Sequence, residues 1–398
     1  MKNHARIRSS FEQHYGHPPE WIARAPGRIN LLGEHVDYND GWVLPAAIDR
    51  CARLAFSAST TSEIMLYAAD LEANVRFDLN ALDDKLDCDG NPLPGWALYP
   101  AGVAWVLRQN HLPISGLQAV LTSQIPIGSG LSSSAAIEVI FAVAWQALSP
   151  WQQTPMELAQ ICQRAENEYV GVQCGLMDPF SILHGVRDHA LFFDTRTLDW
   201  EPVPLPAHVS LVVADSGVRR RLGGSAYNQR REACEQALRL LAKRLPGVHA
   251  LRDVSLDDFR EHEQALPPSL RPIAEHVVGE CVRVLRAADL LKAEDAKGFG
   301  ALMLEGHASL RDLYQVSSPE LDTLVEIARE LPGCLGARLT GAGFGGCTVN
   351  LVEAQTAETF IERLSSAYAQ RTGGKADVWI SRPVDGANLL LHGQRKPV

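Results

Sequence analysis

The stretch "IPIGSGLSSSAAIEVIFAVAWQAL" at residues 125–148 joins an apolar, strand-like run to a long apolar helix pattern through a turn of glycines and serines. Glycines let a backbone approach a ligand closely, and the start of a helix carries about half a positive charge, so this context suits a bound phosphate. The serine hydroxyls can donate to a phosphate or supply an oxygen ligand to Mg²⁺. No Lys precedes the serines, so this is not a Walker A loop. The serines could equally cap a buried helix, and the stretch alone does not choose between these two roles.

Strand-like and helix-like segments alternate on both sides of this stretch. Residues 154–170, "TPMELAQICQRAENEYV", place apolar side chains on one helical face, with Glu166 at its edge. Residues 225–245 predict a helix capped by Ser225, and residues 256–331 are mostly helical by the same criterion. Four further runs are typical of strands: 116–122, 189–194, 208–215 and 347–352. The mixture predicts an α+β or α/β protein.

The chain has 398 residues, which is enough for two domains or one large two-lobed body at about 100–200 residues per domain. The Pro-rich segment "DWEPVPLPAH" at 199–208 is the best candidate for a boundary. We therefore expect an N-terminal lobe over residues 1–200 and a C-terminal lobe over residues 201–398.

Composition and charge exclude several classes of protein. A formal net charge of -10 disfavours nucleic acid as a partner, because phosphate backbones are held by clustered Lys and Arg. The apolar run at 139–145 is far shorter than the roughly 20 residues that cross a bilayer, and no signal core follows the N-terminus. The eight cysteines show no metal-binding spacing, which predicts buried free thiols in a reducing compartment. We expect a soluble, cytoplasmic protein without a membrane partner.

A second glycine-rich stretch, "TGAGFGGCTVNL" at 340–351, contains the spacing G-x-G-x-x-G at Gly341, Gly343 and Gly346. A dinucleotide-binding loop of this pattern must follow a strand and open a helix, but here the glycines lead into a strand-like run. We expect a loop between two strands whose backbone passes close to another part of the structure. Glycine behaviour alone leaves open whether that part is a ligand or another strand.

Two further stretches carry candidate catalytic groups. In "GVQCGLMDPF" at 171–180, Pro179 disfavours a helical conformation at Asp178, which is then either a turn residue or a base that takes a proton from a hydroxyl. In "PGRINLLGEHVDYN" at 26–39, four polar side chains gather within ten positions of a turn-forming stretch. They are Arg28, Glu34, His35 and Asp37.

Together these stretches resemble the GHMP kinase superfamily and, within it, the galactokinase family. The resemblance rests on "APGRINLLGEHVDYNDGWVLPAAI", "IPIGSGLSSSA" and "GARLTGAGFGGCTVNL", with "CGLMDPF" and "VRRRLGGSAYNQRREACE" in support. It extends over nearly the whole chain in the order that the family uses. The first stretch is specific to galactokinases, whereas the second is shared with mevalonate and homoserine kinases.

The resemblance implies a two-lobed α+β GHMP kinase fold, with mixed sheets and an active site in the cleft between lobes. It implies transfer of the γ-phosphoryl group of MgATP to the C1 hydroxyl of galactose, giving galactose 1-phosphate and ADP. Asp178 would be the catalytic base, with Arg28 beside it to keep it ionised and to stabilise the transferring phosphoryl group. The implied sugar ligands are Glu34, His35, Asp37, Gly175 and Tyr227. The implied Mg²⁺ ligands are Ser132 and Glu166. The implied ATP site comprises Trp96, Tyr99, Gly128, Ser129, Gly130, Leu131, Ser132, Ser133 and Ser134.

Three residues depart from the family pattern: Val36 replaces the usual Thr, Pro179 the usual Gln, and Arg220 a common His. None of them removes a proposed catalytic group. The alternatives are a sugar 1-kinase acting on N-acetylgalactosamine, galactosamine or arabinose, and a non-catalytic galactose sensor. Sensors lose part of the phosphate loop, which is intact here together with Asp178 and Arg28. The sequence does not determine the oligomeric state, and we favour a monomer.

Overall fold

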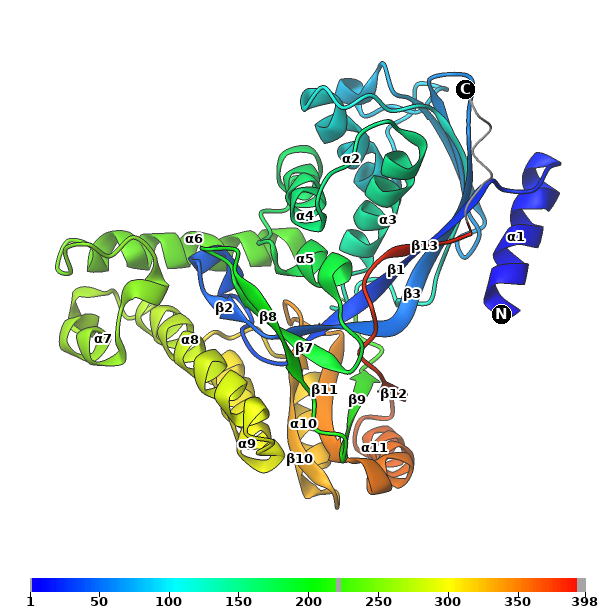
Figure 1. The fold of residues 1–398 in the computed structure, drawn as a ribbon. Helices are drawn as coiled ribbons and strands as arrows, with labels where there is room; N and C mark the ends of the chain where they lie inside the picture. Colours follow the sequence, from blue (N-terminus) through cyan, green and yellow to red (C-terminus); the bar gives the residue numbers. More distant parts are fainter. Residues whose placement is uncertain (1, 220–222, 392–398) are drawn as a thin grey trace.

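The structure, a computed structural model, describes residues 2–219 and 223–391. The part drawn at the top of Figure 1 is built on a six-stranded sheet in the order β13-β1-β3-β6-β4-β5. Adjacent strands of this sheet are antiparallel except β4 and β6, which are parallel. Its strands are β1 (Trp21–Asn30), β3 (Pro45–Ala58), β4 (Glu63–Ala68), β5 (Ala73–Asp78), β6 (Leu117–Ser123) and β13 (Asn388–Leu391).

Helices cover both faces of this sheet (Figure 1). On one face lies α3, which is apolar on nearly every side because it packs against β1 and β3 as well as against three neighbouring helices. On the other face, Ile7 and Phe11 of α1 pack on Ile22, Ala55 and Val120. The helices of this part are α1 (Lys2–Tyr15), α2 (Leu98–Gln109), α3 (Ser133–Leu148), α4 (Pro155–Arg164) and α5 (Met177–His184).

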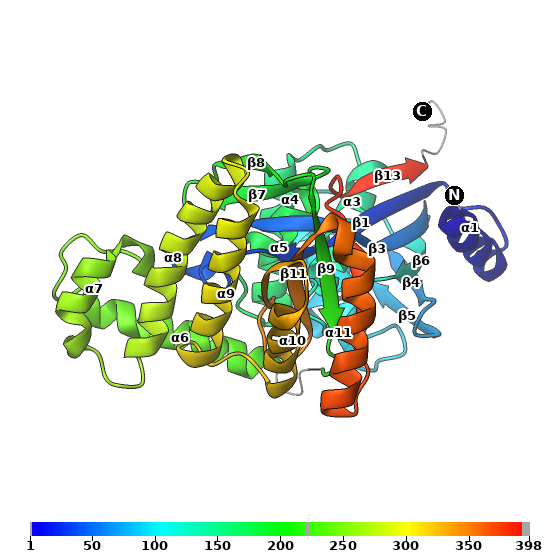
Figure 2. The same ribbon diagram turned by 90° about the horizontal axis from the view of Figure 1, so that it is seen from below.

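The part drawn at the bottom of Figure 1 contains an antiparallel four-stranded sheet in the order β10-β11-β9-β12. Side chains alternate along β9, so Val212 packs toward α10 and α11 while Val213 belongs to the main core with α9. Figure 2 shows α8 beside α9, and α10 beside α11 over this sheet. The elements are α6 (Gly223–Leu241), α7 (Leu256–His262), α8 (Arg271–Lys292), α9 (Ala296–Asp312), α10 (Pro319–Glu330), α11 (Ala357–Thr372), β9 (Val209–Asp215), β10 (Cys334–Thr340), β11 (Cys347–Glu353) and β12 (Asp377–Ser381).

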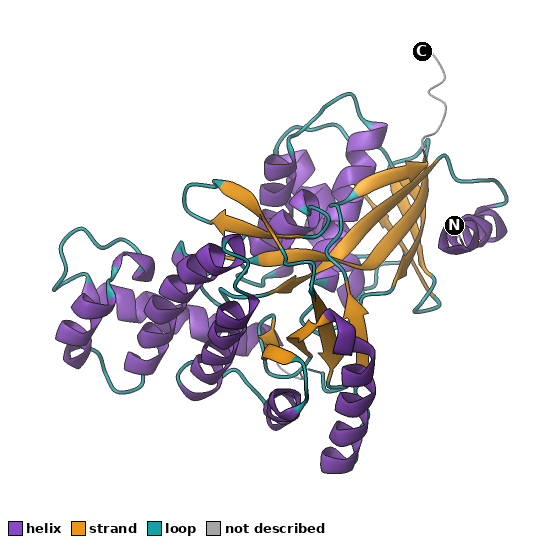
Figure 3. Cartoon of the chain, turned by 60° about the horizontal axis from the view of Figure 1, so that its bottom comes forward, coloured by secondary structure: helices purple, strands orange, loops and turns teal. Residues whose placement is uncertain are grey.

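A small antiparallel sheet and several short helices complete the described chain. Figure 3 shows the strands gathered toward the middle of the molecule, with most helices outside them. The small sheet has the order β2-β7-β8, formed by β2 (Trp42–Val43), β7 (His189–Asp194) and β8 (Trp200–Pro204). The short helices are η1 (Asp37–Asn39), η2 (Leu82–Asp84), η3 (Gly95–Ala97), η4 (Ala165–Val170, a π-helix), η5 (Leu251–Asp253), η6 (Glu263–Ala265) and η7 (Ala354–Thr356).

The predicted mixture of helices and strands is confirmed, and the four predicted strands correspond to β6, β7, β9 and β11. The helix predicted at 154–170 is also present. It begins with a capping box between Thr154 and Glu157, and beyond Arg164 it continues as the π-helix η4. The predicted Ser225 cap is wrong, because α6 begins at Gly223 and Ser225 therefore lies inside its first turn.

The predicted division of the chain near residue 200 stays a prediction. The last described strand, β13, pairs with β1 and so returns to the sheet of the N-terminal residues. The prediction of buried cysteines is wrong for Cys88, which is exposed, whereas five of the other seven are buried. In the parts of the chain that the structure describes, no helix has both the length and the apolar character of a membrane span.

Candidate active site

A pocket lies where β1, the start of α3 and the loop between β10 and β11 meet. We call residues 124–132 the glycine-serine loop and residues 341–346 the β10–β11 loop. The pocket contains every predicted site residue except Ser129 and Leu131, which are buried residues of the glycine-serine loop. It is lined by Arg28, Glu34, His35, Asp37, Gly95, Trp96, Leu98, Tyr99, Ile127, Gly128, Gly130, Ser132, Ser133, Ser134, Ile137, Glu166, Val170, Val172, Cys174, Gly175, Met177, Asp178, Tyr227, Gly341 and Ala342.

Arg28 and Asp178 form a bidentate ion pair in this pocket. The Nε atom of Arg28 donates to Oδ1 of Asp178 at 2.9 Å, and Nη2 donates to Oδ2 at 3.0 Å. Arg28 also donates to the carbonyl of Gly130, so one guanidinium contacts both the carboxylate and the glycine-serine loop. The Arg28 side chain is only 5% exposed and that of Asp178 is 26% exposed. A buried guanidinium therefore orients a carboxylate that remains accessible from the pocket.

The expectation that Pro179 keeps Asp178 out of a helix is wrong. The helix α5 begins at Met177, so Asp178 and Pro179 are its second and third residues. A proline is tolerated there because the first N–H groups of a helix have no partner within the helix. The first turn of α5 thus presents Asp178 to the pocket, while Pro179 is buried behind it.

Ser132 contributes a hydroxyl to the same carboxylate. Its Oγ donates to Oδ2 of Asp178 at 2.5 Å, and its side chain makes no capping hydrogen bond to α3. Its φ of 60° is left-handed. Such a conformation costs a non-glycine residue about 1–3 kcal/mol and is found most often at functional sites.

The β10–β11 loop packs directly on the glycine-serine loop. A Cβ atom at Gly341 would lie 2.4 Å from the carbonyl oxygen of Gly130, and one at Gly346 would lie 2.4 Å from that of Ser129. The prediction of a loop between two strands is confirmed, and its close neighbour is the backbone of the glycine-serine loop. Gly341 and Ala342 also reach the pocket itself.

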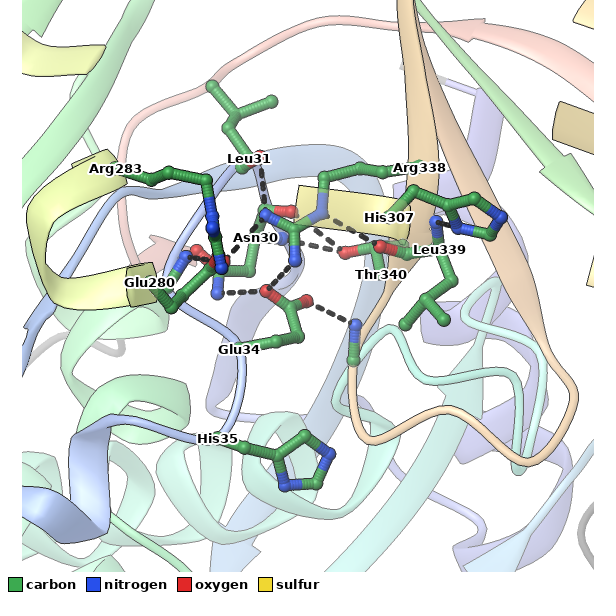
Figure 4. A network of polar contacts seen from close by, with 12 residues as sticks. Asn30, Leu31, Glu34, His35, Glu280, Arg283, His307, Arg338, Leu339 and Thr340 are labelled. Carbon is green, nitrogen blue, oxygen red and sulfur yellow. Dashed lines mark hydrogen bonds and ion pairs between the residues drawn. The ribbon is translucent and has the colours of Figure 1, made fainter. Parts of the chain in front are cut away.

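Glu34 is buried, and three protein groups hold its carboxylate (Figure 4). The amide of Asn30 donates to Oε2 at 2.5 Å, Nη2 of Arg338 donates to Oε2 at 3.2 Å, and the backbone N–H of Gly341 donates to Oε1 at 2.6 Å. Burial raises the pKa of Glu34 to about 7, although the charges of Arg338 and Arg28 act in the opposite direction. Oε1 retains a lone pair that can accept a further hydrogen bond from the pocket.

Asp37 lies beside Gly175 in the pocket. A Cβ atom at Gly175 would lie 2.0 Å from Oδ2 of Asp37, so only glycine leaves room for this carboxylate. Burial, and secondarily the charge of Asp178, raise the pKa of Asp37 to about 6. Two carboxylates and the Arg28–Asp178 pair therefore converge on one small region.

His35 lies next to Glu34 with both ring nitrogens near protein groups. Nδ1 is 2.7 Å from the hydroxyl of Tyr38, and Nε2 is 3.2 Å from the carbonyl of Ala342. The ring of Tyr227 lies 5.4 Å from that of His35, centroid to centroid, so this predicted pair is adjacent. The φ of His35 is 62°, which makes it a second non-glycine pocket residue in the left-handed region.

The departures from the family pattern lie away from the pocket or outside the described residues. Val36 is fully buried in an apolar cluster with Phe180 and Phe193. Pro179 is buried as described above. Arg220 lies outside the residues that the structure describes.

Apart from Trp96 and Tyr99, which the resemblance implied, the sequence did not reveal the apolar side chains of the pocket. Ile127 is 63% exposed at the tip of the glycine-serine loop, and it lines the pocket together with Trp96 and Tyr99. A flat aromatic group could be held between such side chains. No motif marks these positions, because Leu98, Ile137, Val170 and Val172 come from four different segments. Only the fold brings them together.

Glu166 faces the serines at the start of α3. Burial, with the charge of Asp178 next, raises the pKa of Glu166 to about 7, and the Ser134 hydroxyl lowers it. Its Oε2 accepts a hydrogen bond from the thiol of Cys174 at 3.4 Å. The nearby Glu138 is fully buried, and neither of its carboxylate oxygens has a hydrogen-bond partner among the residues that the structure describes. In the described chain, no three His, Cys, Asp or Glu side chains form a group that could hold a metal ion.

The fold and this pocket define a kinase of the GHMP superfamily. The family model described as "GHMP kinases N terminal domain" matches residues 99–186, and "GHMP kinases C terminal" matches residues 287–370. A mevalonate kinase structure superposes on 92% of this chain and 99% of its own with a TM-score of 0.61 at 19% identity, which shows the shared fold.

The more specific match comes from residues 9–58, which fit the model "Galactokinase galactose-binding signature". The chain is 46% identical to the galactokinase of Roseiflexus sp. (strain RS-1), over 99% of each chain. It is 40% identical to that of Homo sapiens, over 97% of this chain and 96% of that one. A crystal structure of Lactococcus lactis galactokinase complexed with galactose matches 96% of this chain and 99% of its own, with a TM-score of 0.91 and 32% identity. The chain belongs to the galactokinase family.

Proposed function

We propose that this protein transfers the γ-phosphoryl group of ATP to the C1 hydroxyl of galactose, producing galactose 1-phosphate and ADP. One observation carries the proposal: the Arg28–Asp178 pair contacts the glycine-serine loop and lines the same pocket as the carboxylates of Glu34 and Asp37. The loop has the chemistry of a phosphate site, and the carboxylates have the chemistry of a polyol site. Membership of the galactokinase family, with its galactose-binding signature, supports galactose as the acceptor.

The proposed sugar site is the part of the pocket around Glu34, His35, Asp37, Gly175 and Tyr227. Ionised carboxylates accept hydrogen bonds from sugar hydroxyls, and the buried setting strengthens such bonds because water does not compete. Gly175 keeps the backbone close to Asp37. The proposed ATP site is the glycine-serine loop with the first turn of α3, and Trp96, Tyr99 and Ile127 border it.

In the proposed reaction, a carboxylate oxygen of Asp178 accepts the proton of the C1 hydroxyl while O1 forms a bond to the γ-phosphorus. The bond between that phosphorus and the β,γ-bridging oxygen breaks, and ADP leaves with the electron pair. Arg28 holds the carboxylate in place through two hydrogen bonds and adds positive charge beside the transferring group. Ser132 fixes the second carboxylate oxygen.

Magnesium is proposed at Glu166 and Ser132. Glu166 suits a divalent cation because it is a buried carboxylate beside the serines, and burial, followed by the charge of Asp178, raises its pKa to about 7. A Mg²⁺ ion bound there with ATP would neutralise phosphate charge. The Ser132 hydroxyl is engaged with Asp178 here, so Glu166 is the better supported of the two ligands.

A panel of aldoses assayed with ATP and Mg²⁺ tests the proposed function. We expect galactose to give the highest kcat/KM, with N-acetylgalactosamine, galactosamine and arabinose well below it. Release of ADP should match formation of sugar 1-phosphate in a one-to-one ratio. Turnover of another aldose with none of galactose would contradict the substrate, and sugar binding without any turnover would favour the sensor.

We further propose that the protein is cytoplasmic and monomeric. Gel filtration with light scattering would test the monomeric state.

Substituting Gly175 by Ala should weaken sugar binding selectively. The new methyl group would overlap the carboxylate of Asp37, which has to move away from its present position. We expect the KM for galactose to rise about tenfold or more, as when a hydrogen bond to a charged group is lost, with the KM for ATP nearly unchanged. Gly374→Ala is the control, because its methyl group would meet only side chains, at 3.3 Å or more. Equal effects of the two changes on galactose KM would contradict the assignment of Asp37.

A further inference from the structure

A chain of buried charges connects the pocket to the C-terminal half of the protein (Figure 4). Arg338 on β10 donates from Nη2 to Oε2 of Glu34 at 3.2 Å and from Nη1 to Oε1 of Glu280 at 3.1 Å. Oε2 of Glu280 in turn accepts a hydrogen bond from Nε of Arg283 at 2.7 Å. The side chains of Arg338 and Glu280 are 0% exposed and that of Glu34 is 2% exposed. Two carboxylates and two guanidinium groups thus alternate along one line of contacts.

The guanidinium of Arg338 is fixed at every nitrogen. Besides the two carboxylates, Nη1 donates to the carbonyl of Leu31 at 3.0 Å and Nε donates to that of Leu339 at 3.2 Å. Glu280 is fixed as well, because its Oε1 accepts the backbone N–H of Gly33 at 2.8 Å. The segment on either side of Leu32 is therefore held from β10 and from α8 at once.

Fold stability alone gives a weak reason for such an arrangement. Taking several charges out of water is costly, and replacing a buried ion pair by apolar groups of similar size is often neutral or stabilising. Of the four charged residues in the line, Glu34 is the one that lines the pocket. This line of charged residues ends at Glu34, in the pocket where a ligand would bind. This position indicates that the line serves to place the Glu34 carboxylate.

We propose that Arg338 is a positioning residue for the acceptor sugar, and that it fixes the Glu34 carboxylate in the orientation that receives a sugar hydroxyl. This inference rests on the proposed function, because it assumes that Glu34 binds the acceptor. Arg338 belongs to the four-stranded sheet, whereas Glu34 follows β1 of the six-stranded sheet. A strand of the C-terminal sheet therefore helps to shape a sugar site whose proposed ligands all precede Arg338 in the chain.

The charged groups around Glu34 predict a pH readout. Arg338 faces it from β10, Arg28 from β1 and Glu280 from α8, while the nearby His276 is neutral at pH 7 because burial lowers its pKa to about 4. The pKa of Glu34 is about 7, so its ionised, hydrogen-bond-accepting form is gained as the pH rises through this value. Removing the Arg338 charge raises that pKa further, so tight sugar binding would require a higher pH.

The test compares Arg338→Lys and Arg338→Met with the unchanged protein. Lysine keeps the charge but has one nitrogen in place of the two guanidinium nitrogens that contact Glu34 and Glu280. We therefore expect the KM for galactose to rise about threefold with Lys and about tenfold or more with Met. The KM for ATP should change by less than about twofold, since no Arg338 contact reaches the glycine-serine loop. The pH at which galactose affinity is gained should move upward with Met and stay near its original value with Lys. Thermal melts establish that each variant is folded. Arg338→Met removes a partner of the buried Glu280 carboxylate. The double variant Glu280→Gln, Arg338→Met removes that charge as well, so it serves as a second test if Arg338→Met alone does not fold.

The matched control is Arg252→Met. Arg252 forms a bidentate pair with Asp194, at 2.6 and 2.8 Å, and its side chain is 10% exposed, but it lies outside the pocket. It should lower the melting temperature without changing the KM for galactose. In a Glu34→Gln background, Arg338→Lys should add less than about a twofold further change, because the two residues act through one interaction.

Each outcome bears on one proposal. An unchanged galactose KM in folded Arg338→Lys and Arg338→Met, or an additive effect in the Glu34→Gln background, would overturn the positioning role and leave the proposed function standing. A protein that phosphorylates no galactose in its unchanged form would instead overturn the proposed function.

Discussion

Replacing Asp178 by Asn is expected to lower kcat by about 10³-fold, within the 10²–10⁴ range that general acid–base catalysis provides. Asparagine has nearly the same shape and can still accept one hydrogen bond from Arg28, but it does not take up the proton of the C1 hydroxyl. Galactose affinity should change by less than about threefold, because binding energy and proton transfer are separate contributions. Steady-state kinetics with galactose and isothermal titration with galactose in the absence of ATP measure the two quantities.

Asp194→Asn is the matched control for this experiment. Asp194 is partly buried and accepts two hydrogen bonds from Arg252, much as Asp178 does from Arg28, but it lies outside the pocket. It should reduce stability and leave kcat within about twofold of the original value. If Asp178→Asn reduced galactose affinity and kcat by the same factor, the carboxylate would have a structural role and the assignment of a base would fail.

The sequence predicted many of the polar residues that line the pocket, because each motif is short and local. Gly128, Gly130 and the three serines act through their own backbone and the helix that follows them, and those features follow from adjacent residues. The position of Arg28 and the carboxylates after it was predictable for the same reason. The contact between Asp178 and Arg28 joins residues 150 positions apart in the chain. It was expected from the family resemblance, because the spacing of the two residues in the sequence does not predict it.

The contacts that hold these groups are long-range, and no local pattern encodes them. Glu34 is held by Arg338 and Gly341, more than three hundred positions later in the chain, and Tyr38 is 2.8 Å from Tyr314, oxygen to oxygen. The prediction for Asp178 is wrong because a following proline only disfavours a helical conformation, and in the first turn of α5 Pro179 removes no hydrogen bond from the helix.

Arg28→Met is expected to lower kcat by about 10²–10³-fold, comparable to the loss of a main charge-stabilising donor. Methionine fills a similar volume, so the change removes the two hydrogen bonds to Asp178, the contact with the Gly130 carbonyl and the positive charge beside the phosphoryl group. Arg28→Lys keeps the charge but loses the planar bidentate geometry, and its kcat should fall between those of Arg28→Met and the original protein. A kcat for Arg28→Met within about threefold of the original would contradict a role for Arg28 in the reaction.

Combining Arg28→Met with Asp178→Asn distinguishes one catalytic unit from two independent groups. If Arg28 acts mainly by holding Asp178, then Asp178→Asn already removes most of its effect, and the double variant should be no more than about tenfold slower than Asp178→Asn alone. If Arg28 stabilised the phosphoryl group independently, the two losses would multiply. We expect the first result, because both Nε and Nη2 of Arg28 are committed to the carboxylate and Nη1 to the loop carbonyl, which leaves no guanidinium nitrogen wholly free for the phosphate. Single-turnover measurements with saturating galactose would isolate the chemical step in which this difference arises.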